Sequence, residues 1–430
     1  MKEAYKKMLR DWRRDLHRYP ESGWTTYRTS ILIAQALDEA GYEVWIGEEI
    51  ISWEEAVDPP TLEVIEACRR RCRQELPDKL WERWQKRMGR LGGVVGRFDS
   101  HRPGLRVAFR WDMDALQISE SQDADHVPVK AGFVSRHPGC FHGCGHDGHA
   151  AVGIVTAIRL LEQAAQMHGQ LLVIFQPAEE GVRGAKSYCR NWKFGSMDRL
   201  ICSHIGFTAS DCLVAGAGGF LATSKLDAEF FGKAAHAGLC PERGKNALLA
   251  AAAAMVSLEE MKGNAGRQVR LNVGVLQGGE ARNTIPAYCR MQLETRGADE
   301  NQNAGIRKKA EEILKHCADS YGVQLQIKEK GASVDAVSSE AFSKQIQNLA
   351  ESMGIYKTCL LHQQFGASDD GAVFMDMVQK SGGEAAYLLF GSRLAGRHHE
   401  IEFDFDESVL DKSCEICVRI GHMLLDQKGT

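Results

Sequence analysis

The densest group of chemically active side chains is an eight-residue segment, His142-Gly143-Cys144-Gly145-His146-Asp147-Gly148-His149. Imidazole and thiolate groups are typical zinc ligands, and added carboxylates also admit manganese or cobalt. The intervening glycines allow sharp turns and a close approach of the backbone to a ligand. The apolar run that follows, Ala150-Ala151-Val152-Gly153-Ile154-Val155, predicts a helix from about Gly148 to Gln166. We therefore expect a rigid metal-binding loop at the N-terminus of a helix.

Four further segments have the apolar character of buried strands, and each is followed by ionisable side chains. The segments are 105–111, 171–175, 200–203 and 385–390. The side chains that follow them are, in order, Asp112 and Asp114, Glu179 and Glu180, His204, and His398 and His399. Because strands alternate with helices, we predict an α/β fold with a mainly parallel sheet covered by helices. Ligands bind at the carboxyl ends of such strands, so these side chains are predicted to share one site with Cys144.

The candidate metal ligands number more than one zinc ion needs. They are Cys144, His146, Glu180, His204 and His399. A single tetrahedral zinc with an open position takes fewer protein ligands. Five ligands suit two ions that share a bridging ligand, an arrangement that activates water and polarises a carbonyl or phosphoryl oxygen. Glu179 is not one of these five candidate ligands, and it is the candidate general base.

The segment from about residue 220 to residue 332 has a different order of predicted strands and helices. Strands and helices are predicted in the order β-α-β-β-α-β, over residues 224–231, 246–261, 269–276, 287–295, 300–321 and 323–328. This order is that of the split βαβ, ferredoxin-like arrangement. We therefore expect residues 220–332 to form an inserted ferredoxin-like α+β domain, and residues 1–219 and 333–430 to form the catalytic domain.

Composition excludes several classes of function. The chain has 430 residues and a formal net charge of −4, so it lacks the strongly basic character of a nucleic-acid-binding protein. No stretch is apolar enough for a membrane span, and the first residues lack the apolar core of a signal peptide. The 13 scattered cysteines favour reduced thiols over a disulfide framework. We therefore expect a cytoplasmic protein.

Seven short motifs, taken together, form a combination that is specific enough to compare with known protein families. In chain order they are Asp112-Met113-Asp114-Ala115-Leu116, the segment 142–149, Gln176-Pro177-Ala178-Glu179-Glu180-Gly181, His204-Ile205-Gly206, Gly232-Lys233-Ala234-Ala235-His236-Ala237-Gly238, Asn283-Thr284-Ile285-Pro286 and His398-His399-Glu400. They span nearly the whole chain. In this combination the sequence resembles the M20 family of metallopeptidases and amidohydrolases. The resemblance is greatest to its aminoacylase-like branch, which includes hippurate and indole-acetyl-amino-acid hydrolases.

The resemblance implies a role for each candidate in the larger domain. Cys144 is expected to bridge two divalent ions, Mn²⁺ or Zn²⁺, and the other four candidate ligands to bind one ion each. Glu179 is expected to act as the base toward the attacking water and later to protonate the leaving nitrogen. Asp114 is expected to orient a metal ligand.

The resemblance also implies roles for three residues of the inserted domain. His236 is expected to reach an active site across a dimer interface and to stabilise the oxyanion. Asn283 and Arg296 are candidates to hold the substrate carboxylate, which an Arg side chain suits geometrically. The partner is expected to be a second copy or a paralogous chain.

The implied reaction is hydrolysis of the amide of an N-acyl or N-aroyl amino acid, an EC 3.5.1-like activity. p-Aminobenzoyl-glutamate is the expected substrate, with p-aminobenzoate and glutamate as products. Two alternatives stay open: a general N-acyl-amino-acid deacylase or dipeptidase, and a chain that is active only with a paralogous partner. The adjacency of His398 and His399 leaves the choice of ligand open. Ser368-Asp369-Asp370 departs from the Ser-Glu-Asp of the family.

Overall fold

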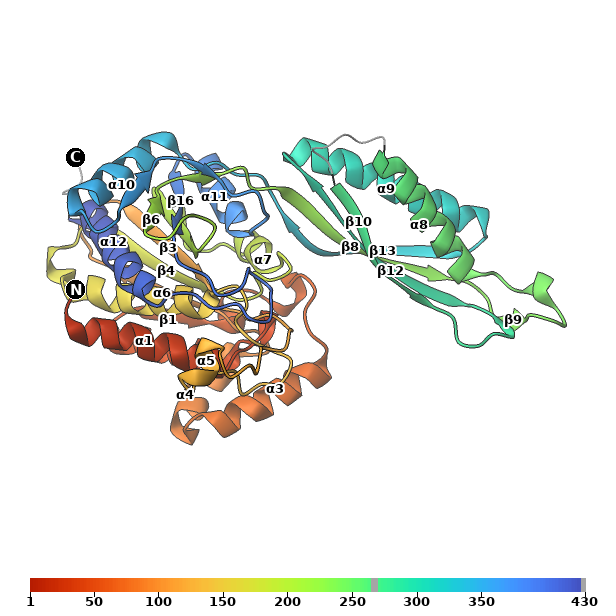
Figure 1. The fold of residues 1–430 in the computed structure, drawn as a ribbon, viewed down its shortest axis with the longest axis horizontal. Helices are drawn as coiled ribbons and strands as arrows, with labels where there is room; N and C mark the ends of the chain where they lie inside the picture. The colour runs from red at the N-terminus through yellow and green to blue at the C-terminus, as the bar shows by residue number, and fades with distance from the viewer. Residues whose placement is uncertain (264–269, 427–430) are drawn as a thin grey trace. The chain divides into compact units, whose positions relative to one another are not determined.

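The computed structural model describes residues 1–263 and 270–426, which form two compact units (Figure 1). The first unit contains Met1–Gly218, Ala336–Phe365 and the chain from Asp370 onward. The second unit contains Gly219–Asp335 and Gly366–Asp369. From the sequence, the inserted domain was expected at 220–332. The segment Gly366–Asp369 was expected in the catalytic domain, but it lies in the second unit. The chain thus passes between the units more often than one simple insertion requires.

The first unit is built on an eight-stranded sheet. Its strands, in spatial order, are β1 (Glu43–Ile46), β2 (Val94–Asp99), β4 (Gln170–Gln176), β3 (Arg106–Asp112), β5 (Arg199–Ile205), β16 (Glu384–Phe390), β6 (Cys212–Val214) and β14 (Thr358–Leu360). The four central strands β4, β3, β5 and β16 are parallel, whereas β1 and β2 are antiparallel additions at one edge. The expected mainly parallel α/β sheet is therefore confirmed.

Helices cover both faces of this sheet (Figure 1). On one face α6 (His146–Leu161) packs against β3, and α1 (Glu3–Arg18) and α12 (Ser408–Leu425) pack against α6. Gly153 of α6 lies so close to the rings of Trp111 and Phe175 that a Cβ atom there would come within 2.7 Å of both. On the other face α11 (Gly371–Lys380) packs against β5 and β16, and α7 (Gly184–Arg190) against α11. The remaining helices are α2 (Tyr27–Ala40), α3 (Leu62–Glu75), α4 (Asp78–Met88), α5 (Val127–Lys130) and α10 (Glu340–Met353).

The second unit has its own sheet and core. The elements follow in the order β8 (Ala222–Phe231), α8 (Ala247–Gly263), β10 (Arg270–Gly278), β12 (Tyr288–Gly297), α9 (Glu300–Ser320) and β13 (Gln324–Ser333). The sheet order β10-β12-β8-β13 is antiparallel throughout. This is the expected split βαβ topology. The first residue of the strand predicted at 269–276 lies outside the described residues.

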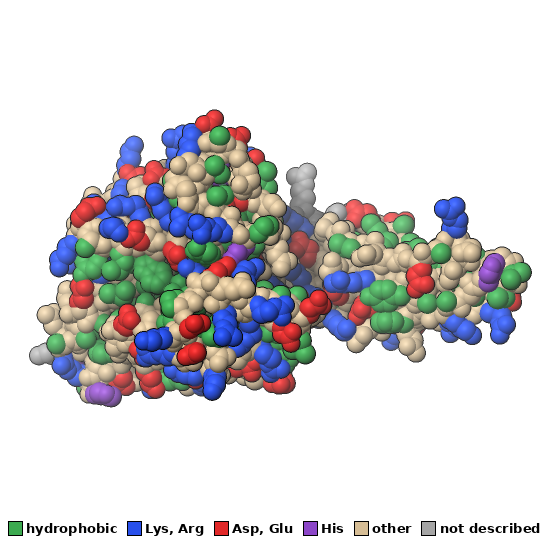
Figure 2. Space-filling view, turned by 90° about the horizontal axis from the view of Figure 1, so that it is seen from below, with side chains coloured by type: hydrophobic (Ala, Val, Ile, Leu, Met, Phe, Trp, Pro, Cys, Tyr) green, Lys and Arg blue, Asp and Glu red, His purple; other side chains and the backbone are tan. Residues whose placement is uncertain are grey.

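The surface carries both signs of charge. On the face drawn in Figure 2, acidic and basic side chains are interspersed, in line with the net charge of −4. Within residues 1–263 and 270–426, no helix has the length and apolar character needed to cross a membrane.

Candidate metal centre

The N-terminus of α6 positions the first two donors. Gly145 precedes the helix with φ +89°, a left-handed conformation that glycine adopts readily. The sequence predicted this helix from residue 148, but the turn at Gly145 starts it at His146. Both Cys144 and His146 are buried, and they flank the glycine. The local backbone therefore brings a thiol and an imidazole to one point at the end of the sheet.

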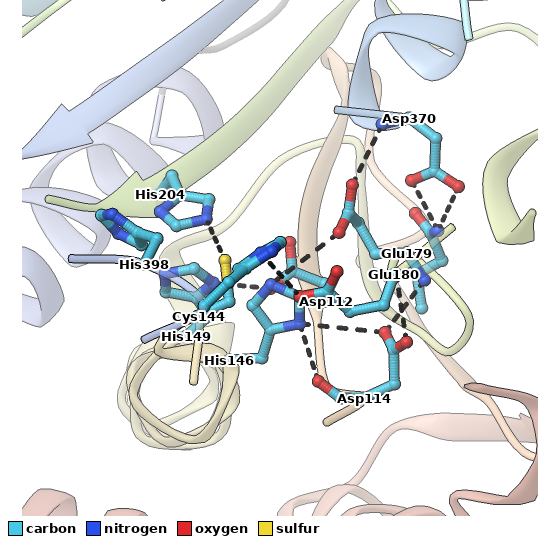
Figure 3. Close-up of polar contacts among 12 residues, drawn as sticks. Asp112, Asp114, Cys144, His146, His149, Glu179, Glu180, His204, Asp370 and His398 are labelled. Carbon is cyan, nitrogen blue, oxygen red and sulfur yellow. Dashed lines mark hydrogen bonds and ion pairs between the residues drawn. The ribbon is translucent and has the colours of Figure 1, made fainter. Parts of the chain in front are cut away.

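One group of donors consists of Cys144, His146 and His204, whose ligand atoms lie within 4.8 Å of one another (Figure 3). His204 comes from the carboxyl end of β5, and its Nε2 lies 3.5 Å from Cys144 Sγ. Its Nδ1 donates a hydrogen bond to the Ile205 carbonyl at 2.7 Å, which leaves Nε2 free to act as a donor to a metal. His146 Nδ1 donates to the Asp114 main-chain carbonyl at 2.8 Å, so the lone pair of its Nε2 is also available to a metal ion.

A second group consists of Cys144, Glu180 and His399. His399 Nε2 lies 3.5 Å from Glu180 Oε1, and the residue has φ +71°, a left-handed conformation that is uncommon for residues other than glycine. The adjacent His398 faces elsewhere: its Nε2 donates to the Ile205 carbonyl at 3.2 Å, and its ring stacks on Phe207 at 4.2 Å. The structure thus groups His399 with the donors and gives His398 a packing role. Cys144 is common to both donor groups.

The Glu179-Glu180 pair is held by Asp114. Its carboxylate accepts the N–H groups of Glu179 at 2.9 Å and Glu180 at 3.1 Å. We expected Asp114 to orient a metal ligand. Its main-chain oxygen accepts from His146 Nδ1, its Oδ1 lies 3.8 Å from the same nitrogen, and its carboxylate also accepts the N–H of Glu180, another candidate ligand. Glu179 Oε2 lies 3.9 Å from His146 Nε2, beside both donor groups.

Burial and charge set the protonation of the donors. Burial raises the pKa of the Cys144 thiol well above its usual range, and the Glu180 charge adds to this. Burial opposes the charged form of His146, but the Asp112 carboxylate, together with Asp114 and Cys144, outweighs it, and the pKa of His146 is raised. Burial, reinforced by His149, lowers the pKa of His204. A divalent cation would displace the protons of Cys144 and His146, because thiolate and neutral imidazole are the forms that bind metal.

The donor set fits divalent cations. It combines one thiol, three imidazoles and one carboxylate, which suits zinc or manganese. His146 Nε2 is buried and has no hydrogen-bond partner among the residues the structure describes. A buried polar atom without a partner is costly, and coordination of a cation would relieve that cost.

From the sequence, Asp112 was expected to share the site with Cys144, but no specific role was assigned to Asp112 or to His149, which lie behind the donors. Asp112 Oδ1 accepts a hydrogen bond from His149 Nδ1 at 2.5 Å and lies 3.7 Å from His146 Nε2. Ile205 N–H donates to His149 Nε2 at 2.8 Å, so both ring nitrogens of His149 are engaged. The position of Asp112 at the end of β3 was the available signal. These hydrogen bonds hold Asp112 and His149 in place behind the donors.

The second unit contains the remaining three candidates. His236, in β9 (Ala235–His236), pairs with Thr284 of β11 (Thr284–Ile285), so Asn283 lies beside it in the chain. Both His236 and Asn283 are exposed. Arg296 lies at the far end of β12 and forms an ion pair with Glu294 at 3.0 Å. Within this unit the structure therefore brings His236 and Asn283 together but not Arg296.

The class of the protein follows from comparison with known families. Residues 108–422 match the profile of peptidase family M20/M25/M40, and the chain belongs to this family. The expected family is thereby confirmed.

Individual relatives cover nearly the whole chain. It is 38% identical over 413 residues to one of the subunits of p-aminobenzoyl-glutamate hydrolase from Escherichia coli strain K12, a match that covers 96% of this chain and 94% of that protein. It is 36% identical to indole-3-acetyl-aspartic acid hydrolase of Enterobacter agglomerans, over 94% of this chain and 92% of that protein. These full-length relatives are hydrolases, which confirms the expected enzyme class.

Solved structures agree with this placement. The aminobenzoyl-glutamate utilization protein of Klebsiella pneumoniae has a TM-score of 0.81 and 31% identity, over 100% of this chain and 99% of that one. A dinuclear metal-binding M20 peptidase of Bacillus subtilis shares the fold, with a TM-score of 0.66 and 20% identity over 99% of each chain.

Proposed function

We propose that this protein is a metal-dependent amidohydrolase that cleaves the amide of an N-acyl or N-aroyl amino acid. The observation that carries the proposal is that two groups of metal donors share Cys144 and lie beside Glu179. Cys144 would bridge two ions, Mn²⁺ or Zn²⁺; His146 and His204 would hold one ion, and Glu180 and His399 the other. When bound, such ions supply Lewis acidity that polarises a carbonyl and acidifies water.

The side chains of the protein would carry the proton transfers. Glu179 would take a proton from the attacking water and deliver it to the amide nitrogen as the C–N bond breaks. Its backbone is fixed by the Asp114 carboxylate, which keeps the base in one orientation. The products are the free acid of the acyl group and the free amino acid.

We propose that residues of the second unit assist the reaction. His236 Nδ1 accepts the N–H groups of Gly238 and Leu239, both at 3.2 Å. The ring proton of a neutral His236 is therefore on Nε2, which suits donation to an oxyanion. Asn283 and Arg296 remain the proposed partners of the substrate carboxylate.

The substrate proposal follows from two relatives. The names of p-aminobenzoyl-glutamate hydrolase and indole-3-acetyl-aspartic acid hydrolase both specify an aromatic acyl group joined to an acidic amino acid. We propose p-aminobenzoyl-glutamate as the first substrate, cleaved to p-aminobenzoate and glutamate. Indole-3-acetyl-aspartate is the second candidate, because its hydrolase is nearly as similar to this chain.

A substrate panel tests the proposal. Purified protein, stripped of metal and reloaded with Mn²⁺ or Zn²⁺, would be assayed on p-aminobenzoyl-glutamate, indole-3-acetyl-aspartate, hippurate, acetylated amino acids and dipeptides. We expect the highest kcat/KM on one of the first two compounds. Equal rates across the panel would instead favour a general deacylase or dipeptidase. Activity that appears only after a paralogous chain is added would favour an obligate heteromer.

The proposal includes a partner and a compartment. The Escherichia coli relative is named as one subunit of its hydrolase, which indicates that such chains can assemble with others, and we propose a homodimer or a paralogous heteromer. None of the 13 cysteines, all of which lie within the described residues, forms a disulfide, which supports the proposal of a reducing, cytoplasmic compartment.

A further inference from the structure

A group of fully buried polar side chains lies between the sheet and α11. Arg110 of β3 donates to Asp112 at 2.8 Å, to Asp370 at 2.9 Å and to the Gln176 side-chain oxygen at 2.8 Å. The Gln176 amide donates to both carboxylate oxygens of Asp370, at 2.8 and 2.9 Å. Ala185 N–H donates to the same carboxylate at 2.8 Å. The carboxylate of Asp370 is therefore held from three sides.

The same residue contacts the proposed base. The main-chain N–H of Asp370, at the N-terminus of α11, donates to Glu179 Oε1 at 3.4 Å (Figure 3). Glu179 thus receives one contact on its side chain from Asp370 and one on its backbone from Asp114. The other carboxylate oxygen, Oε2, lies on the side of His146.

From this geometry we infer that Asp370 is a positioning residue for Glu179. The inference rests on the proposed function, in which Glu179 is the general base. Arg110 and Gln176 hold the Asp370 carboxylate, and this fixes the peptide N–H that aims Glu179 at the donor groups. Asp370 itself touches no reacting atom.

Two features explain why this point of the chain needs an anchor. Ala178, next to Glu179, has φ +58°, a strained conformation for alanine that the surroundings must maintain. Asp370 is also the residue at which the chain re-enters the first unit after the segment Gly366–Asp369, which belongs to the second unit. The buried ion pair with Arg110 fixes the backbone at this point of re-entry.

The main test is the substitution Asp370→Asn. It keeps the size of the side chain but removes the negative charge through which Arg110 and Gln176 hold it. We expect kcat to fall by about 10- to 100-fold, as a small misplacement of a catalytic group does, with KM changed by less than about twofold. Metal content should stay at the wild-type level, because no donor is altered. A kcat equal to the wild-type value in fully metal-loaded protein would overturn the inference.

A second substitution provides a rescue. Gln176→Glu, combined with Asp370→Asn, exchanges the carboxylate and the amide between the two positions. The new amide can donate to the new carboxylate, which still accepts from Arg110, so the net charge and the hydrogen bond between the two side chains are restored with reversed polarity. The single amide oxygen at position 370 then accepts from either Arg110 or the Ala185 N–H, instead of from both. We expect the double variant to recover kcat to within about threefold of wild type. No recovery at all, in a double variant with wild-type thermal stability, would contradict the positioning role.

Asp404→Asn is the matched control. Asp404 is also a buried carboxylate paired with a buried arginine, Arg13, but neither residue contacts Glu179. We expect this variant to lose thermal stability as Asp370→Asn does while keeping the wild-type kcat per metal-loaded molecule. An equal loss of kcat in both variants would show that the effect is one of stability alone.

A crystal structure of Asp370→Asn separates the inference from the proposed function. We expect the Glu179 carboxylate to leave its contact with the N–H of residue 370. An unmoved Glu179 would overturn the positioning role even if activity fell. A displaced Glu179, in a protein whose wild type hydrolyses none of the panel, would support the positioning role and refute the proposed function.

Discussion

Glu179 is the residue on which the proposed chemistry depends most. Asp114 holds its backbone, and Asp370 contacts its side chain. Glu179 lies beside His146 but belongs to neither of the two donor groups that share Cys144. We expect Glu179→Gln to lower kcat by at least about 1,000-fold. The amide can neither take the proton from the attacking water nor deliver it to the leaving nitrogen. Metal content, measured by elemental analysis, should be unchanged. Activity close to wild type would rule out Glu179 as the base.

Cys144 is the donor that both groups share. We expect Cys144→Ala to reduce the bound metal from about two ions to fewer than one per chain, because each ion would lose a ligand. Inductively coupled plasma mass spectrometry after gel filtration measures this stoichiometry. Cys212→Ala, a buried cysteine of β6 outside both groups, is the control and should retain the metal. An unchanged metal count in Cys144→Ala would show that the thiol is not a ligand.

Sequence patterns singled out the candidate donors, whose ligand atoms lie close together in the structure, but not the residues that support them. Cys144, His146, Glu180, His204 and His399 were found because each is a ligand type near a glycine turn or the end of a strand. Arg110 and Asp370 could not be paired this way, since 260 residues separate them and only the folded sheet brings them together. The choice between His398 and His399 likewise depends on a φ of +71° that no residue type reveals.

At the scale of elements, the order of strands and helices was predictable and their ends were not. The four strands of the parallel core and the split βαβ order of the second unit agree with apolar runs and spacing in the sequence. The helix after the metal loop begins earlier than predicted, because Gly145 starts it in a left-handed turn. The segment Gly366–Asp369 was missed because a four-residue crossing between units leaves no pattern.

A buried network ties α1 to the metal loop and gives a prediction about acid stability. His17 of α1 contacts Asp147 and Glu120, both at 2.8 Å, and His126 contacts Glu120 at 3.0 Å. Burial opposes the ionised form of Glu120, but hydrogen bonds from His126 and His17 outweigh it and lower the pKa to about 2. The folded pKa is below the usual value of 4.5, so this stabilisation is full above pH 4.5 and is lost as pH falls toward 2.

Glu120→Gln tests this network. We expect the free energy of unfolding at pH 7 to fall by about 3 kcal/mol, since two histidines lose a buried charged acceptor. Between pH 4.5 and pH 2 the variant should lose less further stability than wild type, as measured by urea unfolding at several pH values. Glu3→Gln, at an exposed glutamate of α1, should reproduce the wild-type profile. Parallel pH profiles for Glu120→Gln and wild type would contradict the assignment.

At the scale of the whole molecule, the two units divide the proposed tasks. The first unit contains both donor groups and the base, with a core that spans the large sheet and α6. The second unit has a separate core under α8 and α9 and contains His236 and Asn283. A unit with its own hydrophobic core can in principle fold alone, and we propose that this unit serves association with another chain.

The exposed face of α8 gives the last prediction. Leu249 and Val256 are 49% and 59% exposed and lie seven residues apart, on one side of the helix. Among the described residues, the neighbouring strand β10 is an edge of its sheet, and its Val275 is 40% exposed. An apolar helix stripe beside an unpaired strand edge is typical of a surface that pairs with another chain. We expect the purified protein to be a dimer by sedimentation velocity, and Leu249→Glu combined with Val256→Glu to make it monomeric.

Two controls make that experiment decisive. Leu62→Glu alters an equally exposed apolar residue on α3 of the first unit and should leave the dimer intact. The monomeric double variant should keep its metal, because the donors lie in the first unit, but lose activity if His236 acts on a partner's site. A dimer that persists in the double variant would place the interface elsewhere. A monomeric wild type that associates only with a paralogous chain would replace the homodimer by a heteromer formed through the same helix.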